Sequence, residues 1–410
     1  MVLAFGRIGL LSFGGPAAQV SVMHRELVEQ RKWLTEQAFL GALSFCMLLP
    51  GPEAMQLATY AGWRLKGIAG GLLAGLLFVV PGALVVAALA LAYVEWGTVP
   101  QVQAAFLGIK ALVVALVCQA LWRLSGKALT GRAQRLWALA AFLAIFAFAL
   151  PFPLLILVAG AWGLWQGGTA EDTPAPSLAS APALGRSLGT ALLWAGAWLA
   201  PLLALKLAGA NFLYDLGAFF ARLAVLSFGG AYALLAWMAQ VTVETHGWLS
   251  PGQMIDALGL AETTPGPLIL VTQFVAMVAG ALRQGPLLGL AAGALTLWVT
   301  FVPCFLFIFV FAPHVERLLA QPRLRAALQA ITAAVVGVIA SLALWFTLHV
   351  LFEVVGRLGP LPLPDPGSFQ PIPAALILIA CALVFGLRAG LLASLCVMAL
   401  LGLASRLLAL

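Results

Sequence analysis

Two short motifs that could bind an anion each occur twice in the chain. The first is Ser-Phe-Gly-Gly, at 12–15 and 227–230, and the second is Pro-Gly-Pro, at 50–52 and 265–267. Glycine pairs adopt backbone conformations that other residues resist, and proline lacks a donor and breaks a helix. A helix broken inside a membrane exposes N–H groups at the positive end of its dipole, which suits an anion. The structural alternative is that Gly-Gly permits close helix packing and Pro-Gly-Pro forms a kink or turn.

Two arginines accompany the first motif. Arg7 and Arg222 each precede the motif's serine by five residues, within apolar sequence. An ionisable residue inside a membrane segment is a functional candidate, and a guanidinium can bind an oxyanion through two parallel hydrogen bonds. The opposing interpretation is that each arginine caps a helix end or extends toward the interface.

Two carboxylates and a lysine could take part in proton coupling. Glu53 directly follows the first Pro-Gly-Pro, whereas Glu262 lies just before the second. Desolvation disfavours the charged form of a buried carboxyl group, so either residue could carry a proton. Either could instead cap a half-helix or pair with a nearby arginine. Lys110 lies inside the apolar stretch 104–122, where it could pair with a carboxylate or line the pathway.

The predicted site joins these residues to the hydroxyl and glycine positions of the motifs. The predicted substrate-binding residues are Arg7, Ser12, Gly14, Gly15, Gly51, Arg222, Ser227, Gly229, Gly230, Thr263, Thr264 and Gly266, and the predicted proton-coupling residues are Glu53, Glu262 and Lys110. Gln56 and Gln273 are amide candidates for the same site, while Glu29 and Glu244 lie toward loops and are interpreted as structural.

No enzymatic chemistry is predicted. The chain lacks HExxH and GxxxxGK[ST] motifs, and its four histidines show no metal-ligand spacing. We therefore expect no catalytic residue, no metal and no cofactor, and the missing phosphate-binding loop excludes direct use of ATP by this chain. Its five cysteines lie in apolar runs and are interpreted as packing residues.

The composition places all of these residues in a membrane. The chain has 410 residues, of which 63% are hydrophobic and 9% charged, whereas soluble domains are about 45–50% apolar and about 25% charged. So few charges cannot cover a water-facing surface. This excludes a cytosolic enzyme, a disordered protein and a secreted disulfide scaffold, and it predicts an integral membrane protein in contact with the lipid bilayer.

The chain is a tandem duplication. Residues 5–52 align without gaps to 220–267, with 18 identities in 48 positions that include Trp33 with Trp248 and both motifs. We expect a first repeat at 1–166, a Gly-, Pro- and Ser-rich linker at 167–186, an extra helix at 187–214 and a second repeat at 215–410.

Apolar segments of sufficient length predict membrane-spanning helices. The long ones are 70–93, 104–122, 187–208, 286–311 and 326–350, with shorter runs at 136–150, 152–166, 372–387 and 389–410. Helices are expected because every backbone group in lipid must be bonded within its own segment. Whether 187–208 crosses the membrane stays open. Glycines repeat at every fourth position over 67–75 and 285–293, which predicts close helix crossings within the chain or at a homodimer interface.

The few charges give the two halves opposite orientations. Loop 24–35 holds three Lys and Arg and its counterpart 239–250 none, while loop 94–103 holds none and its counterpart 314–325 three. Loop 122–135 holds four against one in 345–371. Under the positive-inside rule, equivalent loops lie on opposite sides of the membrane. We therefore predict an all-α polytopic membrane protein with an inverted-topology repeat and helices broken at both motifs, a build common among secondary transporters. The net charge of +7 is interpreted as an orientation signal and not as a nucleic-acid surface.

These motifs resemble the chromate ion transporter family in its long-chain, two-domain form. The resemblance rests on SFGGP, the Trp-Leu-Thr segment and LPGP of the first half and on their echoes SFGGA and TPGP, and it spans nearly the whole chain. It implies a multi-pass protein of the inner (plasma) membrane that exports chromate, a sulfate-like tetrahedral dianion, and confers chromate resistance. The alternatives are a passive anion channel, a transporter of sulfate or another dianion, and a membrane subunit that binds a partner. Pro16 is replaced by Ala231 in the second copy, which argues against strict two-fold symmetry of the site.

Overall fold

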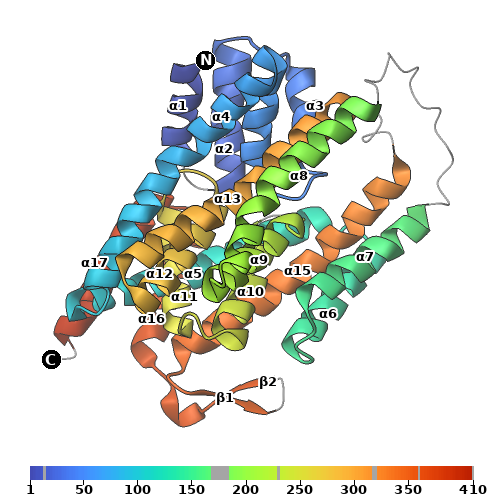
Figure 1. Cartoon of the computed structure of the whole chain (residues 1–410). Helices are drawn as coiled ribbons and strands as arrows, with labels where there is room; N and C mark the ends of the chain where they lie inside the picture. The colour runs from blue at the N-terminus through green and yellow to red at the C-terminus, as the bar shows by residue number, and fades with distance from the viewer. Residues whose placement is uncertain (13–14, 168–183, 229–230, 316–320, 359–360, 409–410) are drawn as a thin grey trace. The chain divides into compact units, whose positions relative to one another are not determined.

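The computed structural model of this chain describes residues 1–12, 15–167, 184–228, 231–315, 321–358 and 361–408 (Figure 1). Within these ranges the secondary structure is helical apart from one two-stranded antiparallel hairpin, β1 (Val355–Leu358) with β2 (Leu361–Pro364). Five helical segments in the described residues are long and apolar enough to cross a membrane: Glu53–Trp96, Pro100–Ala128, Ser187–Leu207, Pro286–His314 and Pro322–Leu351. They contain the five long apolar segments that the sequence predicts. The predicted linker falls largely on 168–183, outside the described residues.

The same order of elements occurs twice. The first half contains α1 (Val2–Leu11), α2 (Gly15–His24), the π-helix η1 (Arg25–Gln30), α3 (Glu36–Cys46), α4 (Glu53–Trp96), α5 (Pro100–Ala128), α6 (Arg132–Phe146) and α7 (Phe152–Gln166). The second half contains α9 (Asn211–Val225), α10 (Ala231–Ala239), the π-helix η3 (Gln240–Thr245), α11 (Pro251–Thr263), η4 (Leu268–Leu270), α12 (Val271–Gln284), α13 (Pro286–Phe311), η5 (Ala312–His314), α15 (Pro322–Leu351), the hairpin, η6 (Pro366–Ser368), α16 (Pro371–Cys381), η7 (Ala382–Gly386) and α17 (Leu391–Leu408). Between them lies α8 (Leu184–Leu207), which has no counterpart.

Both motifs interrupt helices in both copies, as the sequence predicts. The chain leaves α1 before Ser12 and α9 before Ser227, and each Pro-Gly-Pro separates a short helix from the next one. The two π-helical turns lie 215 residues apart, at 25–30 and 240–245, so even this irregularity is repeated. The prediction of an all-α protein with two homologous halves and broken helices is confirmed.

A tight turn makes α4 fold back on itself. Lys66 and Gly67 have non-helical dihedral angles, with φ of +61° at Gly67, and the backbones of Gly62 and Gly70 then lie against each other. The equivalent turn in the second half is Gly285, with φ of +86°, between α12 and α13. Only glycine adopts such angles without strain.

The two glycine stripes lie inside these helical hairpins. A Cβ added at Gly71 would lie 3.1 Å from the carbonyl oxygen of Thr59, and one at Gly289 would lie 2.7 Å from that of Met277. The stripes therefore allow close helix crossings within the chain, which confirms the first of the two predicted alternatives.

The chain divides into two compact units that do not coincide with the repeats. Unit 1 comprises 1–91, 164–231 and 264–328, and unit 2 comprises 92–163, 232–263 and 329–410. Each unit thus combines segments from both halves. Residues of the first and second copies of a motif can therefore meet inside one unit.

Unit 1 is built around the α12–α13 hairpin, with α8 and α9 packed on α13 (Figure 1). Trp194 of α8 contacts the rings of Phe305 and Phe309, with centroids 5.9 and 5.3 Å away. The outer face of α8 carries the exposed leucines Leu188, Leu192, Leu193, Leu199, Leu203 and Leu207. A leucine-rich face of this length suits lipid, so α8 qualifies as a membrane span by length, composition and exposure.

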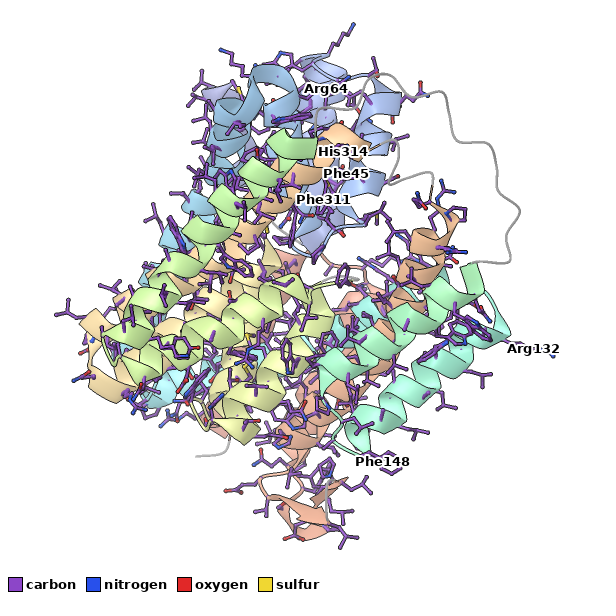
Figure 2. The ribbon with its side chains drawn as sticks, turned by 45° about the vertical axis from the view of Figure 1, so that its right-hand side comes forward. Phe45, Arg64, Arg132, Phe148, Phe311 and His314 are labelled. Carbon is purple, nitrogen blue, oxygen red and sulfur yellow. The ribbon has the colours of Figure 1, made fainter. Side chains whose placement is uncertain are left out.

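Unit 2 is built around α5, which packs against α16 and α17. A Cβ on Gly108 would overlap the Met398 carbonyl and one on Gly402 that of Ala104, so α5 and α17 cross in near backbone contact. In the same unit α6 and α7 form an antiparallel pair beside α15, joined in part by Trp137 and Trp162 with ring centroids 5.3 Å apart (Figure 1). Arg132, in one of the basic loops, points outward from the start of α6 (Figure 2).

Candidate substrate site at the paired helix breaks

Each Pro-Gly-Pro turn is bonded to the Ser-Phe-Gly-Gly break of the other half. The N–H of Gly51 donates to the carbonyl oxygen of Ser227 at 3.1 Å, and the N–H of Gly266 donates to that of Ser12 at 2.8 Å. Both bonds lie inside unit 1. The repeat is therefore expressed as a reciprocal pair of contacts, which is the arrangement expected when two copies are related by an approximate two-fold axis.

The glycine of each turn is required by its backbone and by its surroundings. Gly51 has φ of +123° and Gly266 has φ of +91°. A Cβ at Gly51 would lie 2.7 Å from the Gln56 side-chain nitrogen and 3.0 Å from the Cys304 sulfur. A Cβ at Gly266 would lie 3.0 Å from Leu270 and 3.5 Å from the Cα of Gly82. Side chains are thus excluded from both turns.

Two glutamine side chains hold the turns in place. Gln56 Nε2 donates to the Pro50 carbonyl and Gln19 Nε2 donates to the Gly266 carbonyl, each at 2.7 Å. Gln273 Nε2 donates to the Ala83 carbonyl at 3.0 Å, on α4 next to the second turn. The Oε1 atoms of Gln56 and Gln273 are buried and have no hydrogen-bond partner in the structure. Buried polar atoms are nearly always satisfied, and these two oxygens are acceptors, so they call for a hydrogen-bond donor such as water and not for an anion.

Helix N-termini meet at the paired contacts. In unit 1, α2 begins three residues after Ser12, α4 begins directly after the first Pro-Gly-Pro, and η4 leads into α12 after the second. The first turns of η4 and α12 contain no acidic residue, while that of α4 contains Glu53. The free N–H groups and dipoles of such helix starts attract anions. Ser12, Ser227 and Thr264 are buried beside them.

The two arginines have other bonding partners in the structure. Arg7 Nη1 lies 2.9 Å from Glu26 Oε1, and Arg31 Nε lies 3.3 Å from Glu26 Oε2. The Glu26 side chain is 3% exposed and that of Arg7 is 58% exposed. Arg222 is also exposed, and its Nε donates to the Ala218 carbonyl one turn earlier in its own helix at 3.1 Å. Within the described residues, neither arginine side chain forms a hydrogen bond to a motif, and Arg222 has no ion pair.

The remaining predicted residues are distributed as follows. Glu53 is half-buried at the start of α4. Lys110 lies in unit 2, where its Nζ is 3.2 Å from Asp256 Oδ1. Gly15 is the first residue of α2. Gly14, Gly229 and Gly230, and the side chains of Glu262 and Thr263, lie outside what the structure describes.

Sequence reasoning did not identify Glu26, Asp256 or Gln19. Asp256 is the acidic residue of an otherwise apolar run, Met254–Leu258, and an isolated charge of this kind is the signal that marks a functional residue in a membrane protein. Gln19 carries no such signal, because its role depends on the turn of the other half. No group of three or more His, Cys, Asp and Glu in the described part of the chain could hold a metal ion.

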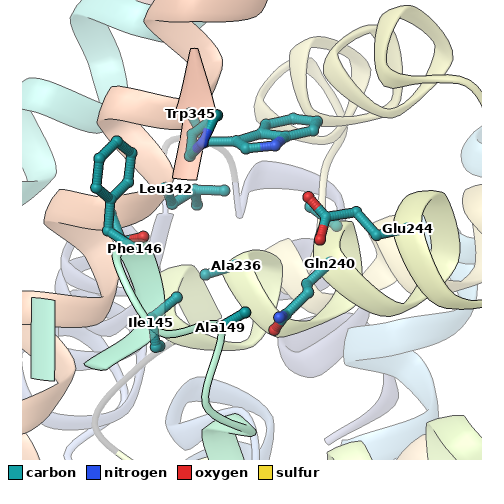
Figure 3. Close-up of a pocket in the computed structure, with 11 residues that line it drawn as sticks. Ile145, Phe146, Ala149, Ala236, Gln240, Glu244, Leu342 and Trp345 are labelled. Carbon is teal, nitrogen blue, oxygen red and sulfur yellow. The ribbon is translucent and has the colours of Figure 1, made fainter. Parts of the chain in front are cut away.

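A hollow in unit 2 does not suit an anion. It encloses about 530 Å³, including its open mouth, and is lined by Ile145, Phe146, Ala149, Ala236, Ala239, Gln240, Glu244, Ser341, Leu342, Trp345 and Pro362. Figure 3 shows Glu244 and Gln240 on one side and Phe146 on the other. The lining has a carboxylate but no lysine or arginine, so a dianion entering it would be repelled.

The fold is that of a polytopic α-helical membrane protein, and its similarity to known sequences makes it a transporter and not an enzyme. The chain belongs to the chromate transporter family, whose sequence model matches residues 1–164 and 214–404. The resemblance inferred from the repeated motifs is thereby confirmed, and the chain is a multi-pass membrane protein.

Curated relatives agree with the family assignment. The chain is 35% identical to a chromate transport protein of Pseudomonas aeruginosa, over 82% of this chain and 77% of that protein. It is 30% identical to a chromate transport protein of Cupriavidus metallidurans, over 83% and 80%, and 29% identical to a probable chromate transport protein of Synechococcus elongatus, over 82% and 81%. No solved structure matches the chain.

Proposed function

We propose that this protein is a secondary transporter that exports chromate, a tetrahedral sulfate-like dianion, across the inner (plasma) membrane and confers chromate resistance. The proposal draws its substrate from the relatives named as chromate transport proteins. It draws its mechanism from one observation, the reciprocal bonding of Gly51 to Ser227 and of Gly266 to Ser12. Because the chain has no phosphate-binding loop, coupling has to come from an ion gradient or a partner, and the proposal takes the ion gradient.

The oxyanion binds where the helix starts meet at the paired turns. There the N-terminal N–H groups and the hydroxyl of Thr264 replace part of its hydration shell. The hydroxyls of Ser12 and Ser227 already donate to the carbonyls of Ile8 and Ala224. The N–H groups of Gly51 and Gly266 are already engaged, so these glycines shape the site and do not donate to the ligand. Arg222, whose charge has no carboxylate partner in the described residues, supplies positive field. Arg7 serves mainly as the partner of Glu26.

Counterflow in proteoliposomes tests this function. Vesicles loaded with unlabelled chromate or sulfate should accumulate labelled chromate, with sulfate competing, and an imposed pH gradient should change the net flux. A passive channel would give flux without concentrative counterflow, and a protein that only binds a partner would give no flux. Either result would refute the proposal.

A hydroxyl variant tests the location of the site. Thr264→Val keeps the shape of the side chain but removes the hydroxyl, and should raise the half-saturation concentration for chromate about tenfold or more, since a hydrogen bond to a charged group contributes about 1.5–3 kcal/mol. Thr347→Val is the matched control, because the hydroxyl of Thr347 bonds only to the Ala343 carbonyl of its own helix at 2.7 Å. Equal half-saturation concentrations in both variants would place the site elsewhere.

A further inference from the structure

Unit 2 contains a buried carboxylate that is bonded on both sides. Asp256, on α11, is 6% exposed. The hydroxyl of Tyr93 donates to its Oδ2 at 2.8 Å, and Lys110 Nζ lies 3.2 Å from its Oδ1. One oxygen thus accepts a hydrogen bond from a neutral hydroxyl group, and the other faces the ammonium group of an ion pair.

Placing these charges on membrane helices has a free-energy cost. Lys110 lies on α5, a helix long and apolar enough to cross a bilayer, where a charged side chain costs about 2.5–3.5 kcal/mol at the centre. A buried ion pair gives little net stability, because apolar residues of similar volume often serve as well or better. Stability alone therefore does not account for the pair.

The elements around Asp256 offer it no other charge. The helices packed on α11 are α5 and α17, and Tyr93 reaches it from the end of α4. Lys110 and Tyr93 are the titratable groups that face the carboxyl group among the described residues. A Cβ at Gly252, one turn earlier on α11, would lie 3.6 Å from Lys110 Nζ, so this glycine leaves room for the ammonium group. A change in the protonation of Asp256 therefore acts directly on the α5–α11 contact.

The triad occurs once, although the framework around it is duplicated. The residue equivalent to Asp256 in the first half is Gly41, and the residue equivalent to Lys110 in the second half is Thr332. The pair joins a helix of the first half, α5, to one of the second half, α11. The Lys110–Asp256 pair is therefore a difference between two otherwise similar repeats. A transporter needs such a difference if proton binding is to favour one of its two conformations.

We propose that Asp256 is the group that binds and releases the coupling proton, with Lys110 as its counter-charge. When the carboxylate takes up a proton it becomes a neutral acid, and Lys110, whose side chain is 24% exposed, is left without its counter-charge. The ammonium group must then leave the pair, which loosens the contact between α5 and α11. Release of the proton restores the pair. The proposal rests on the proposed ion-coupled transport and names the residue that couples it.

Full-length protein in proteoliposomes provides the functional test. Asp256→Asn should retain chromate exchange in counterflow but lose its response to an imposed pH gradient, so that the ratio of fluxes with and without the gradient falls to about one. Asp215→Asn, at an exposed carboxylate on α9, is the matched control and should keep the wild-type ratio. If Asp256→Asn leaves Lys110 unpaired and folds poorly, Lys110→Gln/Asp256→Asn removes both charges and should fold while lacking the response. A wild-type response in a folded Asp256 variant would overturn the proposal.

An infrared measurement separates this proposal from the transport function. Difference spectra of the purified protein between high and low pH should contain a protonated-carboxyl band that Asp256→Asn lacks and Asp215→Asn retains. If wild-type protein shows that band but moves no oxyanion, the proposed transport function fails and the proton site stands. If the band is unchanged in Asp256→Asn, the proton site fails whatever the protein transports.

Discussion

Replacing Arg7 with glutamine distinguishes a structural role for this arginine from a substrate-binding one. In the structure Arg7 neutralises Glu26, a carboxylate only 3% exposed, and the substitution leaves Glu26 with Arg31 as its remaining cation. Breaking a buried ion pair costs roughly 3–5 kcal/mol when the remaining charge has no other partner, so with one of two partners kept we expect Arg7→Gln to cost about 2 kcal/mol. Thermal unfolding in detergent should show this as a lower midpoint.

A double substitution then isolates the cause. Glu26→Gln removes the charge that Arg7 neutralises, so Arg7→Gln/Glu26→Gln should recover most of the lost stability, and the double-mutant cycle gives the coupling energy. If Arg7 acts only through Glu26, the double variant also regains chromate counterflow. A double variant that is stable but inactive would refute this reasoning and assign Arg7 to the oxyanion.

The second copy provides the control. Arg222 occupies the equivalent position, but its Nε bonds only to the Ala218 carbonyl of its own helix, and the side chain is exposed. We expect Arg222→Gln to change stability by less than about 0.5 kcal/mol, as at an ordinary surface position, while lowering the rate of transport. Equal losses of stability at both positions would contradict the asymmetry that the ion pairs indicate.

Three further perturbations test the framework by thermal unfolding. Gly266→Ala forces a Cβ into a residue with φ of +91° and should cost about 1–3 kcal/mol, whereas Gly41→Ala, with no atom within 4 Å of the new carbon, should not destabilise the protein. Gly108→Ala must push α5 away from the Met398 carbonyl and should lower the midpoint, while Gly126→Ala on the same helix meets nothing and should raise it slightly; equal midpoints would argue against the close crossing. Glu36 Oε2 accepts a hydrogen bond from the protonated imidazole of His24 at 2.7 Å, and this bond is the main cause that raises the pKa of His24 above 6.5. Its contribution to stability is therefore complete below that pH and is lost as pH rises through the raised value. The stability difference between wild type and His24→Gln should therefore be largest below pH 6.5 and should shrink as pH rises through the raised pKa of His24, and a constant difference would exclude the charged pair.

The repeated parts of the fold could be predicted because their determinants are local. Glycine and proline restrict the backbone wherever they occur, so two copies of Ser-Phe-Gly-Gly and Pro-Gly-Pro indicated four interruptions of helices. The same local logic could have found the turn inside α4. Lys66-Gly67 is followed by the first glycine stripe just as Gln284-Gly285 is followed by the second.

The partners of these motifs could not be predicted, because they depend on contacts between residues more than 150 positions apart. Nothing in the sequence states that Gly51 bonds to Ser227 and not to Ser12. Similarity between the two repeats identifies only residues that occur in both of them. It therefore identifies Arg7 and Arg222 but not Glu26 or Asp256. Their equivalents, Val241 and Gly41, have no charge.

Charged residues that occur in only one of the two repeats allow a duplicated transporter to move its substrate in one direction. In a transporter built from two repeats, each repeat can adopt the conformation of the other. When the two repeats exchange conformations, the binding site opens to the opposite side of the membrane. If every contact were symmetric, both states would have equal energy and no ion could favour either. The ion pairs Arg7–Glu26 in unit 1 and Lys110–Asp256 in unit 2 have no equivalents in the opposite copy, because Val241 replaces the first carboxylate and Gly41 the second. A ligand shifts a conformational equilibrium only by its difference in affinity for the two states. We therefore expect proton dependence to follow the unsymmetric pair Lys110–Asp256, and oxyanion affinity to follow the symmetric turns.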